Sequence, residues 1–289
     1  MKGWWLRLVA PGFVLLWSTG FIGARLGMPH AEPMTFLAIR FALTAAILLV
    51  VALLLRVPWP ARASAWGHLA VAGLLMHGVY LGGVFVAIRL GLEAGLSALI
   101  VSTQPLLVAA AAPFLLAEPV GARRWLGLAL GLVGVSLVLS GKLGGSGGAM
   151  AVMACVAALV GITVGTLYQK RFCGTHDLRS GNMIQFAAAT MACGLAALAF
   201  ETRHVDWAPE LLFALFWLVG VLSLGAVPLL YVLLRRGAAS RVSSLFFLVP
   251  PTTALLAWPL FGERLGPVAI LGMVLAVAGV ALVNLERRA

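Results

Sequence analysis

A single arginine lies within an otherwise apolar stretch of the sequence. Arg40 is part of FLAIRF at residues 36–41, and the apolar run FALTAAILLVVALLL begins at residue 41. A guanidinium at the centre of a lipid bilayer costs at least ~2.5–3.5 kcal/mol, so such residues usually serve a transport route. Counted along a helix from Pro33, Arg40 is predicted about 10 Å below the outer face. We expect an outer-gate or structural role, in which the stem reaches toward the interface or the guanidinium binds carbonyls where the first helix ends, rather than direct contact with a substrate.

Weakly polar and aromatic side chains are predicted near the middle of several other apolar stretches. Trp17 is about 20 Å of helix into its stretch, too deep for an interfacial tryptophan. His77 and Tyr80 are three residues apart and therefore share one helix face. Such rings can stack on an apolar ring, although each Ser or Thr alone is more often a contact between helices. The predicted substrate-binding residues are Trp17, Ser18, His77, Tyr80, Ser102, Gln104, Thr163 and Ser244.

Prolines are predicted to interrupt two of the apolar helices. Pro105 has no N–H for the carbonyl of Val101, and Pro250 and Pro251 likewise leave two carbonyls unpaired. Breaks at corresponding positions in two halves of a chain indicate a transport site, and a tolerated kink explains them equally well. We assign hinge roles to Pro105, Pro250 and Pro251.

The sequence contains no pattern typical of catalysis or of a bound cofactor. The five histidines are scattered, and a nucleophile paired with a base is not evident. Cys155, Cys173 and Cys193 have the spacing of no metal motif. GKLGGSGG at 141–148 is not a phosphate loop, because Ser136 stands where its first glycine is required. We predict no cofactor, no metal and no enzyme activity, and an integral-membrane enzyme is the less favoured alternative.

The composition indicates an integral membrane protein. Of 289 residues, 62% are hydrophobic and only 10% are charged, whereas a soluble domain is about half apolar and a quarter charged. The net charge is +11, but the basic residues lie singly or in pairs between apolar runs, which argues against nucleic acid. The expected partners are the lipid bilayer and a small-molecule substrate, with the protein a monomer or a weak homodimer.

Ten segments are long and apolar enough to cross the hydrocarbon core, which takes ~20 residues. Most of the 20 Lys and Arg residues fall on one side of the resulting topology, which places both termini in the cytoplasm. The acidic residues all fall at or beyond segment ends, so the simplest mechanism is gradient-driven alternating access, with coupling through His77 left open. The segments are 4–24, 33–55, 66–88, 94–116, 122–141, 148–170, 180–200, 209–234, 240–261 and 266–285.

The second half of the sequence repeats the first at an offset of about 145 residues. IRFA at 39–42 aligns with IQFA at 184–187, which makes Gln185 the counterpart of Arg40. Five spans per half is an odd number, so the two copies must cross the membrane in opposite senses, as in many secondary transporters. The predicted fold is an all-α integral membrane protein with ten transmembrane helices in two inverted-topology five-helix repeats. The repeats are residues 1–141 and 148–289, and the Gly-rich hinge between them is 142–147.

Several of these stretches resemble a known family. WSTGFIGARLG, EPMTFLAIRF and the FGE that precedes LGMVLAVAGVALV are similar to the drug/metabolite transporter superfamily, in its EamA-type ten-helix branch. The resemblance covers the whole chain and implies an exporter of the bacterial inner membrane. The aromatic candidates are most similar to those of the aromatic amino-acid exporters, which implies export of aromatic or large neutral amino acids. The alternative is a multidrug transporter or a sugar or nucleotide-sugar transporter of the same fold.

Overall fold

The computed structural model describes residues 5–92, 97, 100–140, 148–261 and 266–284. Within these ranges the regular structure is helical, and one antiparallel bridge joins Ala31 to Val205. Among the described residues, six helical segments are long and apolar enough to cross a membrane, and two further apolar stretches, Leu8–Ala24 and Gln104–Leu116, are shorter. The chain is therefore a multi-pass membrane protein. The six segments are Pro33–Leu54, Ala63–Arg89, Ala149–Phe172, Leu178–Phe200, Pro209–Arg236 and Pro267–Asn284.

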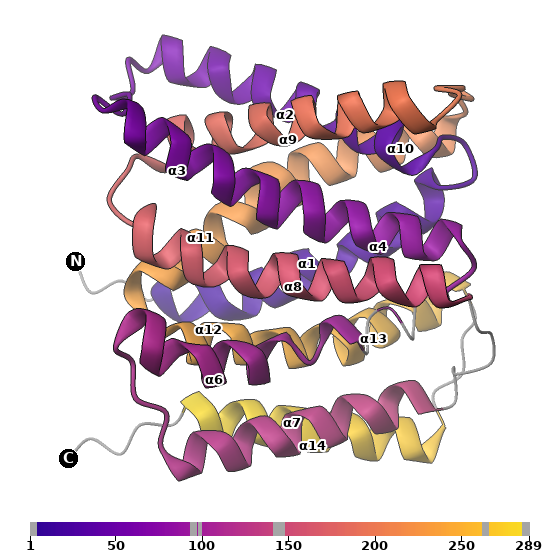
Figure 1. Cartoon of the computed structure of the whole chain (residues 1–289). Coiled ribbons are helices and arrows are strands. Elements are labelled where there is room, and N and C mark those ends of the chain that lie inside the picture. Colours follow the sequence, from indigo (N-terminus) through magenta and orange to yellow (C-terminus); the bar gives the residue numbers. More distant parts are fainter. Residues whose placement is uncertain (1–4, 93–96, 98–99, 141–147, 262–265, 285–289) are drawn as a thin grey trace.

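The helices run side by side in layers (Figure 1), with α2 and α9 along one edge and the α7–α14 pair along the other. In the first half they are α1 (Trp5–Gly27), α2 (Pro33–Leu54), α3 (Ala63–Gly73), η1 (Leu74–Val79), α4 (Tyr80–Arg89), α6 (Gln104–Leu116) and α7 (Ala122–Ser140). In the second half they are α8 (Ala149–Phe172), α9 (Leu178–Phe200), α10 (Pro209–Trp217), η2 (Leu218–Ala226), α11 (Val227–Arg236), α12 (Ala239–Ser244), η3 (Leu245–Leu248), α13 (Val249–Phe261) and α14 (Pro267–Asn284).

Helices at corresponding positions in the two halves pack against each other in an antiparallel sense. Helix α7 contacts α14 through glycines, because a Cβ on Gly134 would lie 2.4 Å from the backbone nitrogen of Ala276. Likewise, a Cβ on Gly279 would lie 2.6 Å from the carbonyl oxygen of Gly127. The small residues of GLALGLVG thus let the two backbones meet directly, and they join the two halves at this edge.

Two glutamates connect α2 to the end of α9. The Glu201 carboxylate accepts hydrogen bonds of 2.7 Å from the backbone N–H groups of Met34 and Thr35, in the first turn of α2. These N–H groups have no partner within the helix, and a carboxylate also favours the positive end of the helix dipole. Glu32 in turn accepts bonds from Thr202 and Arg203. The exchange fixes the start of α2 against the loop that follows α9.

Two segments of the bundle depart from α-helical geometry at corresponding places. The segment Ala63–Arg89 contains the π-helical turn η1, and the segment Pro209–Arg236 contains η2. A π-helical turn shifts the backbone hydrogen bonds by one residue and is often found at functional sites. His77 lies in η1 and its counterpart Ser223 lies in η2. These turns orient both side chains toward the centre of the bundle, where both are buried.

The predicted proline breaks coincide with helix ends in the structure. Helix α6 begins at Gln104 after a turn, with Pro105 in its first turn, where a missing N–H costs little. Helix α13 follows the 3₁₀ turn η3 and has Pro250 and Pro251 in its first turn. These three prolines therefore lie at the start of a helix rather than in the middle of one.

Candidate functional site

Arg40 lies at the centre of the bundle with its guanidinium buried. Its side chain is 1% exposed. The Nε and Nη2 groups donate hydrogen bonds of 3.3 Å to Ser223 Oγ in η2. The guanidinium carbon is 5.6 Å from the centroid of the neighbouring Phe41 ring. The Arg40 guanidinium thus lies inside the bundle, where Ser223 is its hydrogen-bond acceptor among the described residues.

His77 is held in an aromatic stack beside this arginine. Its ring stacks on Phe186 of α9 with the ring centroids 4.2 Å apart and an interplanar angle of 17°. Phe41 lies 5.8 Å from the His77 ring and 5.7 Å from that of Phe186. Rings from α2, η1 and α9 therefore form one apolar wall, and the only polar edge of this wall is the imidazole.

A chain of buried hydrogen bonds continues from His77 toward one end of the bundle. The Tyr231 hydroxyl is 3.5 Å from His77 Nε2 and donates a 2.7 Å bond to Gln185 Oε1. Gln185 Nε2 donates in turn to Gln169 Oε1 at 3.0 Å. Gln185 is the repeat counterpart of Arg40, so the same position carries a bonded amide in one half and a cation in the other.

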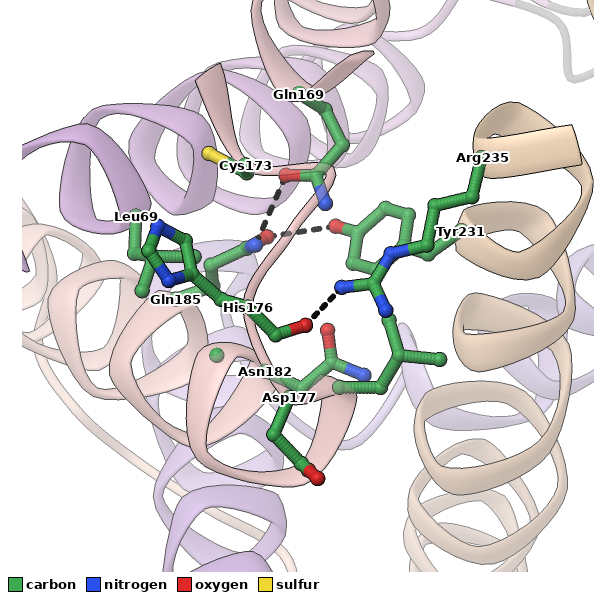
Figure 2. Close-up of a pocket in the computed structure, with 11 residues that line it drawn as sticks. Leu69, Gln169, Cys173, His176, Asp177, Asn182, Gln185, Tyr231 and Arg235 are labelled. Carbon is green, nitrogen blue, oxygen red and sulfur yellow. Dashed lines mark hydrogen bonds between the residues drawn. The ribbon is translucent and has the colours of Figure 1, made fainter. Parts of the chain in front are cut away.

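This chain of hydrogen bonds forms the floor of a pocket (Figure 2). Gln169, Gln185 and Tyr231 lie on one side of it, and Arg235 of α11 projects into it and donates to the backbone oxygen of His176. Asn182 is 2% exposed and its Oδ1 lacks a hydrogen-bond partner within the described residues. The pocket contains about 150 Å³ of empty space, its mouth included, and its other lining residues are Leu69, Cys173, Asp177, Leu178 and Gly181.

Trp17 and Tyr80 lie near Arg40 and the rings of Phe41, His77 and Phe186, and we call these six residues the central cluster. The Trp17 ring lies 5.2 Å from that of Phe13 and 5.3 Å from that of Phe246, at the break before α13. The Trp17 side chain also interacts with the Tyr80 hydroxyl, and Tyr80 is within electrostatic range of Arg40. These two predicted residues thus lie between α1 and the Arg40 guanidinium, and both are buried.

The other predicted binding residues make contacts between or within helices. Ser18 Oγ donates to the Val14 and Val249 oxygens, Thr163 donates within its own helix to Leu159, and Ser102 is buried beside the break before α6. Gln104 Nε2 donates to Thr166 and Ser243 at 3.3 Å, and Gln104 Oε1 has no partner in the described structure. Ser244 donates to the Arg241 oxygen and accepts from Asn284. These five residues are occupied by protein contacts in this conformation.

The residues predicted to bind the substrate do not include Tyr231, Ser223 or Phe186. Ser223 is a polar residue in the middle of the predicted span 209–234, and it also stands at the repeat position of His77. Tyr231 is flanked by apolar residues and carries no periodic signal that marks its hydroxyl as buried. Phe186 directly follows Gln185, the counterpart of Arg40, but nothing in the sequence distinguishes it from other apolar residues. The structure adds all three to the centre.

Ionic contacts between described residues lie near the ends of the bundle. Lys170 Nζ is 2.6 Å from Glu118 Oε1 and also donates to the Gly237 oxygen, while Glu118 Oε2 accepts from the backbone N–H of Ala239. Asp177 accepts hydrogen bonds from Arg179, which hold the pKa of this carboxyl below its ordinary value. The Glu118 contacts join the first half of the chain to the start of α12 in the second.

A model of the EamA-like transporter family matches residues 4–140 and again residues 149–285. The chain therefore belongs to this family of transporters, and the double match shows that it contains two copies of the family's repeat. The matched segments begin 145 residues apart, in agreement with the offset seen in the sequence.

Several bacterial proteins are similar to this chain along almost its whole length. The uncharacterized transporter YvbV of Bacillus subtilis is 26% identical over 278 residues, which is 96% of this chain and 90% of that protein. The uncharacterized inner membrane transporter YedA of Escherichia coli K12 is 28% identical over 282 residues, which is 94% of this chain and 88% of the YedA chain. A Salmonella typhimurium protein named "Probable amino-acid metabolite efflux pump" is 25% identical, with 92% and 90% covered.

A crystal structure shares the fold of this chain. It aligns with a TM-score of 0.78 at 21% sequence identity and covers 96% of both chains. At that identity the likeness concerns the fold alone.

Proposed function

We propose that this protein exports small amphipathic metabolites, aromatic and large neutral amino acids in particular, by alternating access. The observation that carries the proposal is the central cluster, in which aromatic rings and one cation lie together. Trp17, Tyr80, Phe41 and the His77–Phe186 stack offer apolar faces to a ring or a branched side chain. Relatives named as amino-acid metabolite efflux pumps support the same substrate class.

The proposed topology has ten spans in two inverted halves, with both termini in the cytoplasm of a bacterial inner membrane. The antiparallel packing of α7 on α14, and the contacts between the start of α2 and the end of α9, support the inversion. In Figure 1, α1 begins and α14 ends on the same side of the bundle, as this topology requires. The helix breaks at Pro105 and at Pro250 and Pro251 serve as hinges between the two access states.

The pocket beside Gln185 is the proposed cytoplasmic entrance. It lies between α8, α9 and α11, at the bundle end that has the α8–α9 connection. Its floor is the hydrogen-bonded layer formed by Tyr231, Gln185 and Gln169. On the other side of this layer, the Tyr231 hydroxyl lies 3.5 Å from His77 Nε2. In the present conformation this layer separates the entrance from Arg40, so export requires Tyr231 and Gln185 to separate.

Competitive flux in proteoliposomes tests the proposed substrate class. Phenylalanine and leucine are expected to compete with a labelled aromatic amino acid, while a sugar and a nucleotide do not. Trp17→Ala combined with Tyr80→Ala is expected to reduce flux about tenfold or more, because two aromatic contacts are lost from the substrate path. Transport confined to the sugar or the nucleotide would replace the proposed class by the sugar or nucleotide-sugar alternative. Flux unchanged in the double variant would overturn the site.

A further inference from the structure

Arg40 is a buried cation for which the described structure provides no opposite charge. Burial of an ionised group costs several kcal/mol unless a counter-charge and hydrogen bonds offset it. Within the described residues, Ser223 Oγ is the sole hydrogen-bond acceptor of this side chain, and the other close group is the Phe41 ring. A hydroxyl and a ring carry no negative charge, so the guanidinium is not neutralised by the surrounding residues.

The carboxylates that the structure describes are engaged at the ends of helices. Glu32 and Glu201 bind backbone N–H groups near the start of α2 and the end of α9, and Glu118 is paired with Lys170. Asp177 binds Arg179, and Asp206 binds His30. Glu210 lies in the first turn of α10 at the exposed end of that helix. None of these carboxylates contacts Arg40.

We infer that the carboxylate of a transported solute binds to Arg40 and supplies the missing negative charge. The Nε and Nη2 groups converge on one acceptor, Ser223 Oγ. Two parallel N–H groups of an arginine fork match the two oxygens of a carboxylate, a pairing that a lysine cannot reproduce. In this conformation the Ser223 hydroxyl occupies the position that a carboxylate oxygen would take.

The surroundings of Arg40 complete a site for an amphipathic acid. The ring wall of Phe41, His77 and Phe186 lies beside the guanidinium, and Tyr80, which interacts with Trp17, lies within electrostatic range of it. A solute that places its carboxylate on Arg40 can therefore lay an apolar ring or branch against these aromatic faces. The same positive charge repels amines that lack a carboxylate. This role rests on the proposed transport function and differs from the outer-gate role that the sequence favours.

Thermal unfolding of the purified, detergent-solubilised protein tests the inference with three small ligands. Phenylalanine carries both charges, 3-phenylpropionate lacks the ammonium group, and phenethylamine lacks the carboxylate. We expect phenylalanine and 3-phenylpropionate to raise the unfolding temperature of the wild type, because ligand binding to the folded state stabilises it. Phenethylamine is expected to raise it much less. A wild type that no carboxylate ligand stabilises would overturn the inference without any variant.

Arg40→Gln is the main variant, because the counterpart position already carries a glutamine. We expect it to weaken binding of both carboxylate ligands by about tenfold or more, and to leave phenethylamine unchanged or improved. Without ligand, Arg40→Gln is expected to unfold at a higher temperature than the wild type, since an uncompensated charge has been removed. Arg40→Lys restores the charge but not the two-pronged geometry, so partial recovery is expected.

Gln185→Met is the matched control at the same position of the other half. It removes the bonds to Tyr231 and Gln169, so it should lower the unfolding temperature without changing the preference for carboxylates. Equal loss of all three ligands in Arg40→Gln, or a less stable ligand-free Arg40→Gln protein, would show a structural role and overturn the inference. If 3-phenylpropionate binds through Arg40 and phenylalanine does not bind, the proposal that amino acids are the substrate is rejected, while the proposed carboxylate site at Arg40 is supported. If phenylalanine binds equally well to the wild type and to Arg40→Gln, the proposed substrate class is supported and the proposed carboxylate site at Arg40 is rejected.

Discussion

His77 and Ser223 stand at corresponding positions, 146 residues apart, and each lies in a π-helical turn. Both turns contact the opposite half: η2 packs against α2 and presents Ser223 to Arg40, and η1 packs against α9 and stacks His77 on Phe186. Each half therefore inserts one irregular turn against the second helix of the other. The centre of the bundle is built from these two reciprocal contacts.

The helix breaks before α6 and α13 are expected to control the rate of transport. In the Pro105→Ala/Pro251→Ala variant each alanine supplies an N–H that lets a continuous helix form across the break. We expect slower proteoliposome flux with little change in ligand affinity, because the binding residues remain in place while the hinges stiffen. Pro113→Ala, an exposed proline inside α6, is the control and should leave the flux unchanged. Normal flux in the double variant would mean that the breaks are static geometry.

The bond between Tyr231 and Gln185 is expected to be important for stability. Tyr231→Phe removes the 2.7 Å donor to Gln185 Oε1, and a buried acceptor left unpaired costs ~1–3 kcal/mol. The free energy of unfolding can be measured in mixed micelles for this variant, for Gln185→Leu and for the two combined. The double variant should lose less than the sum of the two single losses, because the partners share one interaction.

Tyr168→Phe is the comparison for Tyr231→Phe, because the Tyr168 hydroxyl is bonded to His68 at a less buried position. There, water can replace the lost partner, so a smaller effect is expected. Equal losses of unfolding free energy in Tyr168→Phe and Tyr231→Phe would contradict this prediction. So would losses of Tyr231→Phe and Gln185→Leu that add up fully in the double variant.

The glycine contact between α7 and α14 predicts opposite effects for the same substitution at two sites. Gly134→Ala places a methyl group 2.4 Å from the backbone nitrogen of Ala276, so overpacking should cost ~1–3 kcal/mol of unfolding free energy. Gly194 of α9 has open space at its Cβ position. Gly194→Ala should therefore stabilise the helix by up to ~1 kcal/mol. Denaturant unfolding of the two variants measures the sign, and stabilisation by Gly134→Ala would contradict the close contact.

Glu32 predicts a dependence of stability on pH. The Thr202 hydroxyl, together with the backbone N–H groups of Thr202 and Arg203, holds the pKa of Glu32 below its ordinary value of 4.5. A lowered pKa in the folded state means that the stabilisation is complete above the ordinary pKa and is lost as the pH falls through the lowered one. The unfolding temperatures of wild type and Glu32→Gln should therefore differ at neutral pH and converge in acid. Glu210→Gln, at an exposed site, serves as control, and a gap for Glu32→Gln that persists in acid would disprove the assignment.

Much of the fold follows from residue types, whereas part of the site depends on backbone geometry that those types do not encode. Apolar length predicts spans such as Pro33–Leu54, and prolines predict helix interruptions because a missing N–H acts locally. The pairing of Trp17 with Tyr80 is consistent with their predicted depth. The bond from Arg40 to Ser223 was not predicted, because it depends on a π-helical turn in η2, and no residue in LVGVLSLGA requires one.

If the two halves are the inverted copies that we propose, the difference between Arg40 and Gln185 makes them electrically unequal. Two halves of identical sequence would make the states open to either side equal in energy, since exchanging the halves would convert one state into the other. Here one half contributes a fixed positive charge at its second helix and the other a neutral amide tied to Tyr231. In the proposed alternating-access cycle the two states are therefore not related by symmetry even with no solute bound, and the electric potential across the membrane acts on the charged half more than on the other.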